Sequence, residues 1–240
     1  MNPRVQYLLH WLGVDMIQVG HIERLIAAIG ALIGIASCWM VSQYFVGHAS
    51  ATLIIASVGA GAVLLFGVPH GALSQPWPAT GGHLLSAIVG VSCARWVEPT
   101  WLAGSVAVGL AVLVMHYARC LHPPGGATAL IAVVGGQDIH ALGYAYVLEP
   151  VMLNALILLC VALLFNNIVA SRRYPAALVK AVAEPSPQIS ASGRIMPEHL
   201  RAALSEMDIV ADISEEDLWV IIARAEFYAS KQGKADTLQQ

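Results

Sequence analysis

The stretch with the clearest chemical potential is a histidine followed by two prolines and two glycines, His122 to Gly126. Proline fixes the backbone angle φ without needing an amide partner, and glycine lets another group approach the backbone closely. The sequence therefore predicts that a helix begins here, inside an apolar part of the chain. The first amides of a helix lack partners and carry about half a positive charge, so a helix start is a natural anion site.

A second stretch follows the same plan. Pro76–Pro78 precedes Gly81-Gly82, and an apolar run then ends at Gly90, just as the run after Gly126 ends at Gly135. Two helix starts that converge near the middle of a bilayer are typical of the broken helices of transporters. We interpret the two stretches as a two-fold internal repeat, whose two short helices either span the membrane or re-enter from one face.

The candidate substrate-binding residues come from both stretches. The polar side chains among them can supply hydrogen-bond donors in addition to those of the backbone amides. Binding an inorganic anion requires no acid, base or nucleophile. The set comprises Thr80, Gly81, Gly82, His83, Ser86, His122, Pro123, Pro124, Gly125, Gly126, Ala127 and Thr128.

Each polar residue also has a structural explanation. A histidine before two prolines can cap a loop carbonyl, and serine or threonine on a membrane helix often bonds the preceding turn. Glu149 at a helix start is more typical of a dipole partner than of a proton carrier. No paired carboxylates and no nucleophile with a base indicate an enzyme, and we expect no cofactor. No metal site is expected either, because no metal-binding motif has the spacings of His70, His83, His116 and His122.

The composition places these stretches in a membrane. The chain has 240 residues, 58% hydrophobic and 11% charged, with a mean hydropathy of +0.69. No Asp, Glu, Lys or Arg occurs in residues 25–94, 99–118 or 150–171. Such gaps are typical of transmembrane helices and argue against a soluble enzyme or a nucleic-acid-binding protein.

We predict an all-α, polytopic membrane protein with four long transmembrane helices and two short helices that begin at the Gly-Gly pairs. The long helices are expected at about residues 25–46, 51–68, 101–117 and 147–170. Small residues let membrane helices approach closely, and the first two helices contain Gly30, Gly34, Gly59 and Gly61.

The basic residues predict the topology. They precede the first span, follow the third and follow the last, so the positive-inside rule places both termini in the cytoplasm, in the bacterial inner membrane. The residues counted are Arg4, Arg24, Arg119, Arg172 and Arg173.

The chain divides into four parts. We expect an N-terminal interfacial helix at residues 1–24, a transmembrane domain at 25–175, a linker at 176–194 and a small cytosolic helical tail at 195–240. The tail is too short to bury a core of its own, so it is expected to dock on the membrane domain or another subunit. A homo-oligomer is therefore expected, most simply a dimer.

The residues also resemble a known family. The run Leu121–Leu130 is similar to the His-Pro-Pro signature of the HPP family of integral membrane proteins, and the resemblance covers about residues 25–175. One departure is Val68–Ala72, which stands where the family has a small, serine-rich run. Further similar blocks are Phe66-Gly67, Gln75-Pro76, Gly81–Ala87, Asn166-Asn167 and Arg173–Pro175.

The resemblance implies four transmembrane helices and, because chloroplast and cyanobacterial members are implicated in nitrite transport, nitrite as substrate. Together with the helix starts, it predicts a transporter or channel for a small inorganic anion, bound at helix N-termini near the bilayer midplane. Its expected partners are the anion, the lipid bilayer and further copies of the chain. The alternative is a membrane-embedded anion-binding or sensor protein that signals through its cytosolic tail, since some bacterial members carry a regulatory nucleotide-sensing module after the membrane part.

Overall fold

The computed structural model describes residues 20–169 apart from Gly47, residues 172–178 and six isolated positions nearer the termini. For residues 44–46 and 48–54 it describes the backbone alone. Most of the expected interfacial helix, most of the linker and most of the cytosolic tail therefore lie outside the described residues; residues 21–24, expected in the interfacial helix, belong to α2.

Every regular element in this part of the chain is helical, as predicted. In chain order, the elements are α2 (His21–Val46), α3 (His48–Ala62), the π-helical η2 (Val63–Gly67), the 3-10 turn η3 (Ala72–Ser74), α4 (Pro76–Trp96), α5 (Thr100–Tyr117), α6 (Pro123–Val134), α7 (Gly136–Leu142), the π-helical η4 (Val147–Met152), α8 (Leu153–Asn166) and the 3-10 turn η6 (Ala176–Leu178).

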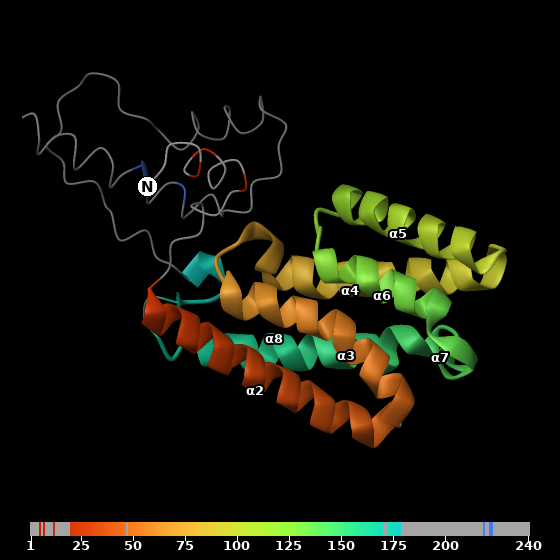
Figure 1. Cartoon of the computed structure of the whole chain (residues 1–240), viewed down its shortest axis with the longest axis horizontal. Helices are drawn as coiled ribbons and strands as arrows, with labels where there is room; N and C mark the ends of the chain where they lie inside the picture. The colour runs from red at the N-terminus through yellow and green to blue at the C-terminus, as the bar shows by residue number, and fades with distance from the viewer. Residues whose placement is uncertain are drawn as a thin grey trace, which may run out of the picture.

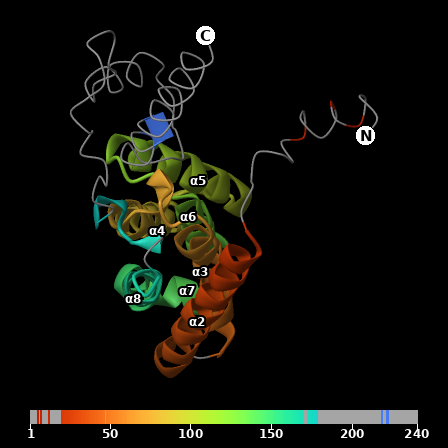
Figure 2. The same cartoon turned by 90° about the vertical axis from the view of Figure 1, so that its left-hand side faces the viewer.

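The helices form a bundle in which successive long helices run in alternating directions (Figure 1). Seen from its end, α5 lies at one side, α2 and α8 lie at the other, and α3, α4 and α6 lie between them (Figure 2). Because α5 runs back along the bundle, α4 and α6 run parallel to each other, side by side. The two stretches of the expected repeat therefore start at the same end of the molecule.

The outer surface of the bundle is apolar. Three helices are long and apolar enough to cross a membrane, at His21–Gln43, Thr100–Tyr117 and Val147–Asn166. Large apolar side chains such as Leu32 of α2 and Leu164 of α8 are exposed on their outer faces, as in helices that face lipid. The chain is therefore a helical membrane protein.

The first Gly-Gly pair does not begin a short helix, so that prediction is wrong for α4. This helix begins at Pro76 and has 21 residues. Proline supplies the start because it needs no amide partner. Gly81 and Gly82 lie one turn further on, where their missing side chains make room for Cys120 and His122.

The second Gly-Gly pair lies in a short helix, as predicted, but it does not mark the start of that helix. α6 has 12 residues and begins at Pro123, with Gly125 and Gly126 in its first turn. The equivalence of the two stretches ends at Gly90, because α4 continues beyond it whereas α6 ends before Gly135.

The glycines of α2 admit aromatic side chains from two other elements. A Cβ at Gly30 would lie 2.5 Å from Phe66 and 2.7 Å from Phe165, and Gly34 also faces Phe66. Close packing at these positions is as predicted. Gly59 is an exception, since a Cβ there would meet no atom within 4 Å.

A buried arginine fixes the end of the bundle where α4 starts. The guanidinium of Arg172 pairs with Glu23 of α2 and donates to the carbonyl of Phe66 at the end of η2. Its Nε donates to Asn166 Oδ1, at the end of α8, at 3.2 Å. Because the guanidinium presents its donors in a rigid plane, it holds α2, η2 and α8 in one arrangement.

Candidate functional site

The helix α6 begins inside the bundle. A Cβ at Gly82 would lie 2.5 Å from Cβ of His122, the residue that precedes α6, so the two residues are level. At a rise of about 1.5 Å per residue, this level lies roughly 9 Å beyond the start of α4. A helix that starts at such depth is the feature that the sequence predicted for this stretch.

Two buried histidines meet at this level. The ring centres of His83 and His122 are 5.1 Å apart, with the ring planes at 67°, and the side chains are 3% and 0% exposed. His122 Nδ1 donates to the carbonyl of Leu73 at 2.9 Å. Its Nε2 is buried and has no hydrogen-bond partner among the described residues. A buried polar atom of this kind calls for a ligand or a water to replace its lost hydration.

The hydroxyl of Thr128 joins three helices. It donates to the carbonyl of Pro124 in its own helix at 3.2 Å. Thr128 Oγ1 also lies 2.8 Å from His83 Nδ1 on α4 and 2.9 Å from Ser57 Oγ on α3. A hydroxyl has one hydrogen, and we assign that of Thr128 to the carbonyl of Pro124, which can only accept; His83 and Ser57 then both donate to Thr128.

Gly61 of α3 leaves space in front of both imidazoles. A Cβ at this position would lie 3.3 Å from Leu158 Cδ2 of α8, 3.8 Å from His122 Nε2 and 3.9 Å from His83 Nε2. The two Nε2 atoms therefore lie within 4 Å of one point, between α3, α4 and α6. We call this arrangement, made by His83, His122, Thr128, Ser57 and Gly61, the histidine site.

The two helix starts supply few free amides. In α4, two of the first three residues are prolines, and Ala79 N donates to Gln75 O at 3.0 Å. In α6, the first two residues are prolines, and Gly125 N donates to His122 O at 2.8 Å. One first-turn amide is left in each helix. The imidazoles, rather than the amides, are thus the main polar groups at this depth.

The structure gathers seven of the twelve predicted site residues around the histidine site. All seven are buried: Gly82, His83, Ser86, His122, Pro124, Gly125 and Thr128. The others lie apart or at its margin: Thr80, Gly81, Pro123, Gly126 and Ala127. Thr80, for example, donates to the carbonyl of Pro76 in its own helix at 2.7 Å, and a Cβ at Gly126 would face Val108 of α5.

Three residues at or beside the site were not predicted from the sequence as site residues. Ser57 and Gly61 lie four residues apart and therefore share one face of α3. This spacing can be recognised in the sequence, because the helix is apolar and has few polar residues. Tyr146 donates its buried hydroxyl to the carbonyl of Thr128 at 3.0 Å. No sequence pattern indicated this last contact.

Replacing Tyr146 with phenylalanine is expected to lower the free energy of unfolding by about 1 kcal/mol, because the buried carbonyl of Thr128 loses the donor that it has from outside its own helix. Thermal unfolding in detergent measures the change. Tyr144 provides the matched control, since it is exposed and its hydroxyl lies 3.0 Å from Ser92 Oγ on the surface. A loss in Tyr144→Phe as large as that in Tyr146→Phe would contradict the expectation.

The loop between η2 and α4 covers the histidine site at its nearer end. The carbonyl of Leu73 in this loop accepts the hydrogen bond from His122. The segment after α8, residues 172–178, also holds the loop. Tyr174 donates its hydroxyl to Ser74 O at 2.7 Å, and Ala176 N donates to Gln75 Oε1 at 3.0 Å. The segment that leads to the tail is therefore in contact with the loop on His122.

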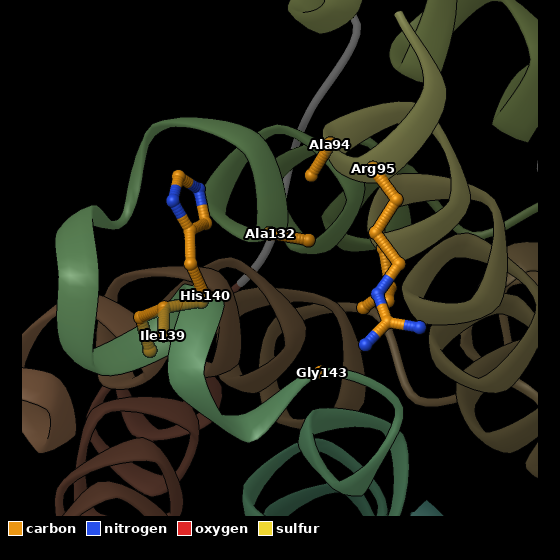
Figure 3. A pocket seen from close by; sticks show the side chains of 7 residues that line it. Ala94, Arg95, Ala132, Ile139, His140 and Gly143 are labelled. Atoms are coloured by element: carbon orange, nitrogen blue, oxygen red, sulfur yellow. The ribbon is translucent and has the colours of Figure 1, made fainter.

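A pocket of about 50 Å³ opens at the opposite ends of α4 and α6 (Figure 3). Arg95 of α4 and His140 of α7 lie on opposite sides of it. The guanidinium carbon of Arg95 lies 5.2 Å from the ring centre of Tyr144, and His140 Nε2 donates to Val133 O at 2.9 Å. The pocket therefore offers a cation at one end of the α4 and α6 pair.

An apolar outer surface around a buried polar centre defines this chain as a helical integral membrane protein. The sequence profile described as "HPP, transmembrane region" matches residues 17–175. The chain therefore belongs to the HPP family of integral membrane proteins, as its sequence resemblance implied.

Similar proteins include two transmembrane proteins of Dictyostelium discoideum. One is 33% identical over 184 residues and the other 32% identical over 182 residues. Each match covers 71% of this chain but 62% and 57% of the respective relative, so the chain spans less than two thirds of their length. No solved structure matches this chain.

Proposed function

We propose that the protein transports a small inorganic anion, nitrite first, and that His83 and His122 hold it inside the bundle. The proposal is carried by His122 Nε2, which is buried, has no partner among the described residues and faces the same point as His83 Nε2. Ionisable residues inside a membrane domain typically mark a substrate or ion pathway.

The surroundings favour a small anion that is held by hydrogen bonds. No Asp, Glu, Lys or Arg occurs in residues 25–94, 99–118 or 120–137, so the helices around the site provide no fixed countercharge beside it; Arg95 lies at the far end of α4. α6 begins at Pro123, directly after His122, and the positive end of its dipole therefore lies beside the site. A triatomic anion such as nitrite has oxygen acceptors that suit ring N–H and hydroxyl donors.

The aromatic residues support a membrane position for α4 and α5. Trp77 and Trp96 are exposed near the two ends of α4, and Trp101 and Tyr117 are exposed at the two ends of α5. Aromatic residues gather at both membrane interfaces, and these pairs lie roughly 24–29 Å apart along their helices, close to the thickness of a hydrocarbon core. In this arrangement, α4 spans the membrane and the histidine site lies about a third of the way along it.

Binding can be tested before transport. Nitrite is expected to raise the melting temperature of the purified protein more than nitrate, chloride or sulfate at equal ionic strength, because a ligand of the folded state stabilises it. The His122→Leu variant should lose the nitrite-specific part of the shift. Equal shifts for all four anions would show a general salt effect and would contradict a selective site.

We assign to Arg95 the role of concentrating anions in the pocket at the end of α4 and α6 that is opposite their starts. Arg95→Gln is expected to raise the KM for nitrite roughly threefold at low ionic strength, with little change in maximal rate. The difference should shrink at high salt because screening shortens the reach of the charge. Initial uptake rates into liposomes measure both values. Arg95→Lys keeps the charge and should keep the KM, and an unchanged KM in Arg95→Gln would contradict this role.

The contact between residues 172–178 and the loop favours a second function, that of a membrane-embedded anion sensor. Tyr174 and Ala176 hold the loop that accepts a hydrogen bond from His122, and the linker to the tail continues from this segment. Anion binding at His122 would then alter the start of the tail. A sensor needs no flux, so the rate of anion uptake separates the two functions.

A further inference from the structure

We infer that the histidine site binds its anion only together with a proton, so that nitrite and H⁺ cross the membrane as an electroneutral pair. The inference rests on the proposed transport function and adds the co-transported ion. It follows from the position of the ring hydrogens on His83 and His122.

The hydrogen bonds determine which nitrogen of each ring carries the hydrogen. A carbonyl can only accept, so His122 Nδ1, at 2.9 Å from Leu73 O, is protonated. We assign the hydroxyl hydrogen of Thr128 to the carbonyl of Pro124, so that His83 Nδ1, at 2.8 Å from Thr128 Oγ1, donates as well. A neutral imidazole has one N–H, and both Nε2 atoms therefore present lone pairs.

Two lone pairs that face one point cannot hold an anion. Both are within 4 Å of the Cβ position of Gly61, and the oxygens of nitrite are acceptors too. One proton resolves the conflict: it bonds to the Nε2 lone pair of His122, the ring nitrogen without a partner among the described residues, and the new N–H donates to a nitrite oxygen. On release this N–H bond breaks, and the proton leaves with nitrite. No electron is transferred.

No charged group in the part of the chain that the structure describes lies where it could neutralise that proton. Among the described residues, the remaining titratable groups near the rings are Tyr146, which donates to Thr128 O, and Cys120, beside Gly82. The other neighbours are neutral: Ser57 and Gly61 of α3, Ser86 of α4, Met115 of α5 and Leu158 of α8. Of the described carboxylates, Glu23 pairs with Arg172, and Glu98, Asp138 and Glu149 are exposed.

This absence of countercharge couples the two ions. A protonated ring buried in the bundle without a counter-ion is costly, and so is an anion beside two lone pairs. Each ion removes the cost of binding the other. Binding of nitrite and binding of the proton must therefore favour each other to the same degree.

Proteoliposomes that contain a trapped pH-sensitive dye test the inference directly. The full chain is reconstituted, an inward nitrite gradient is applied in mildly alkaline buffer, and nitrite and internal pH are followed together. Protein-free liposomes give the unaided leak of nitrous acid, which is subtracted. The expected result is one proton taken up with each nitrite and an uptake rate that an imposed membrane potential does not change.

The outcomes are distinct. Nitrite uptake without acidification, driven by an imposed potential, would overturn the proton inference and leave the transport function intact. Nitrite uptake no faster than in protein-free liposomes would overturn the transport function and, with it, the inference.

His122→Gln separates the proton from the anion. A glutamine amide carries a permanent N–H donor, so this variant should still take up nitrite, but without the proton and with a rate that depends on membrane potential. His116→Gln is the matched control, since His116 is exposed on α5, and it should keep the one-to-one ratio. Retained coupling in His122→Gln would contradict a role for this ring.

A second variant serves if His122→Gln does not fold. Gly61→Ser places a hydroxyl group in front of the two lone pairs. This hydroxyl would donate a hydrogen bond to a ring nitrogen in place of the proton and would occupy the position of the anion. It should raise the melting temperature and abolish uptake, whereas Gly61→Ala should abolish uptake without the same gain in stability. Normal uptake by Gly61→Ser would contradict the position of the site.

Discussion

Replacing His122 with leucine is expected to reduce nitrite uptake by about 100-fold. The imidazole supplies the buried nitrogen that faces the shared point, and a hydrogen bond to a charged ligand contributes about 1.5–3 kcal/mol, or roughly 10- to 150-fold. Leucine has a similar size and no donor, so it fills the space without binding the anion. Initial uptake rates in proteoliposomes measure the effect.

The control for this variant is His116→Leu, because His116 lies exposed on α5 and away from the histidine site. It should retain the uptake of the unmodified protein. Melting temperatures in detergent show that both variants are folded. A folded His122→Leu protein with unchanged uptake would remove His122 from the substrate path.

Replacing Gly90 with alanine is expected to destabilise the protein by about 3 kcal/mol, although alanine favours helices more than glycine does. A Cβ at this position would lie 2.5 Å from the carbonyl oxygen and 2.8 Å from the Cα of Ala129. These atoms belong to the backbone of α6, which cannot rotate away as a side chain can. α4 and α6 must therefore separate, and the histidine site between their starts loses its geometry.

Gly109→Ala is the matched control for this substitution. Gly109 lies in α5, and a Cβ there would meet no atom within 4 Å, so the change should stabilise the protein by up to about 1 kcal/mol through helix propensity alone. Thermal unfolding of both variants in the same detergent gives the comparison. Changes of the same sign would show that the contact between α4 and α6 is not as close as the structure indicates.

The sequence was most informative about the helices that face lipid. The third span, predicted at residues 101–117, is α5 at Thr100–Tyr117, because a charge-free apolar run bounded by polar residues has few alternatives in a membrane. The length of α4 was underestimated because glycine pairs usually interrupt a helix. Here Gly81 and Gly82 remain helical, since the space they leave is filled by Cys120 and His122. Such a contact from another element is not encoded in the local pattern.

The site could likewise be predicted only in part, because some of its contacts join elements that are distant in the sequence. His83 and Thr128 belong to the two helix starts that the sequence singled out, and the structure brings them to 2.8 Å. Ser57 lies 71 residues from Thr128 in the chain, so their contact depends on how α3 packs on α6. The prolines that predicted both helix starts also remove most of the free amides there, and this shifts the expected binding groups from the backbone to the imidazoles.

Nitrite uptake into liposomes that contain the purified protein tests the central claim most directly. The measurement compares the unmodified protein, His122→Leu and protein-free liposomes in mildly alkaline buffer, where unaided entry as nitrous acid is slow. Transport through the histidine site predicts saturable uptake by the unmodified protein and rates near those of protein-free liposomes for the variant. Equal rates in all three preparations would contradict transport and would leave the sensor function as the explanation of the site.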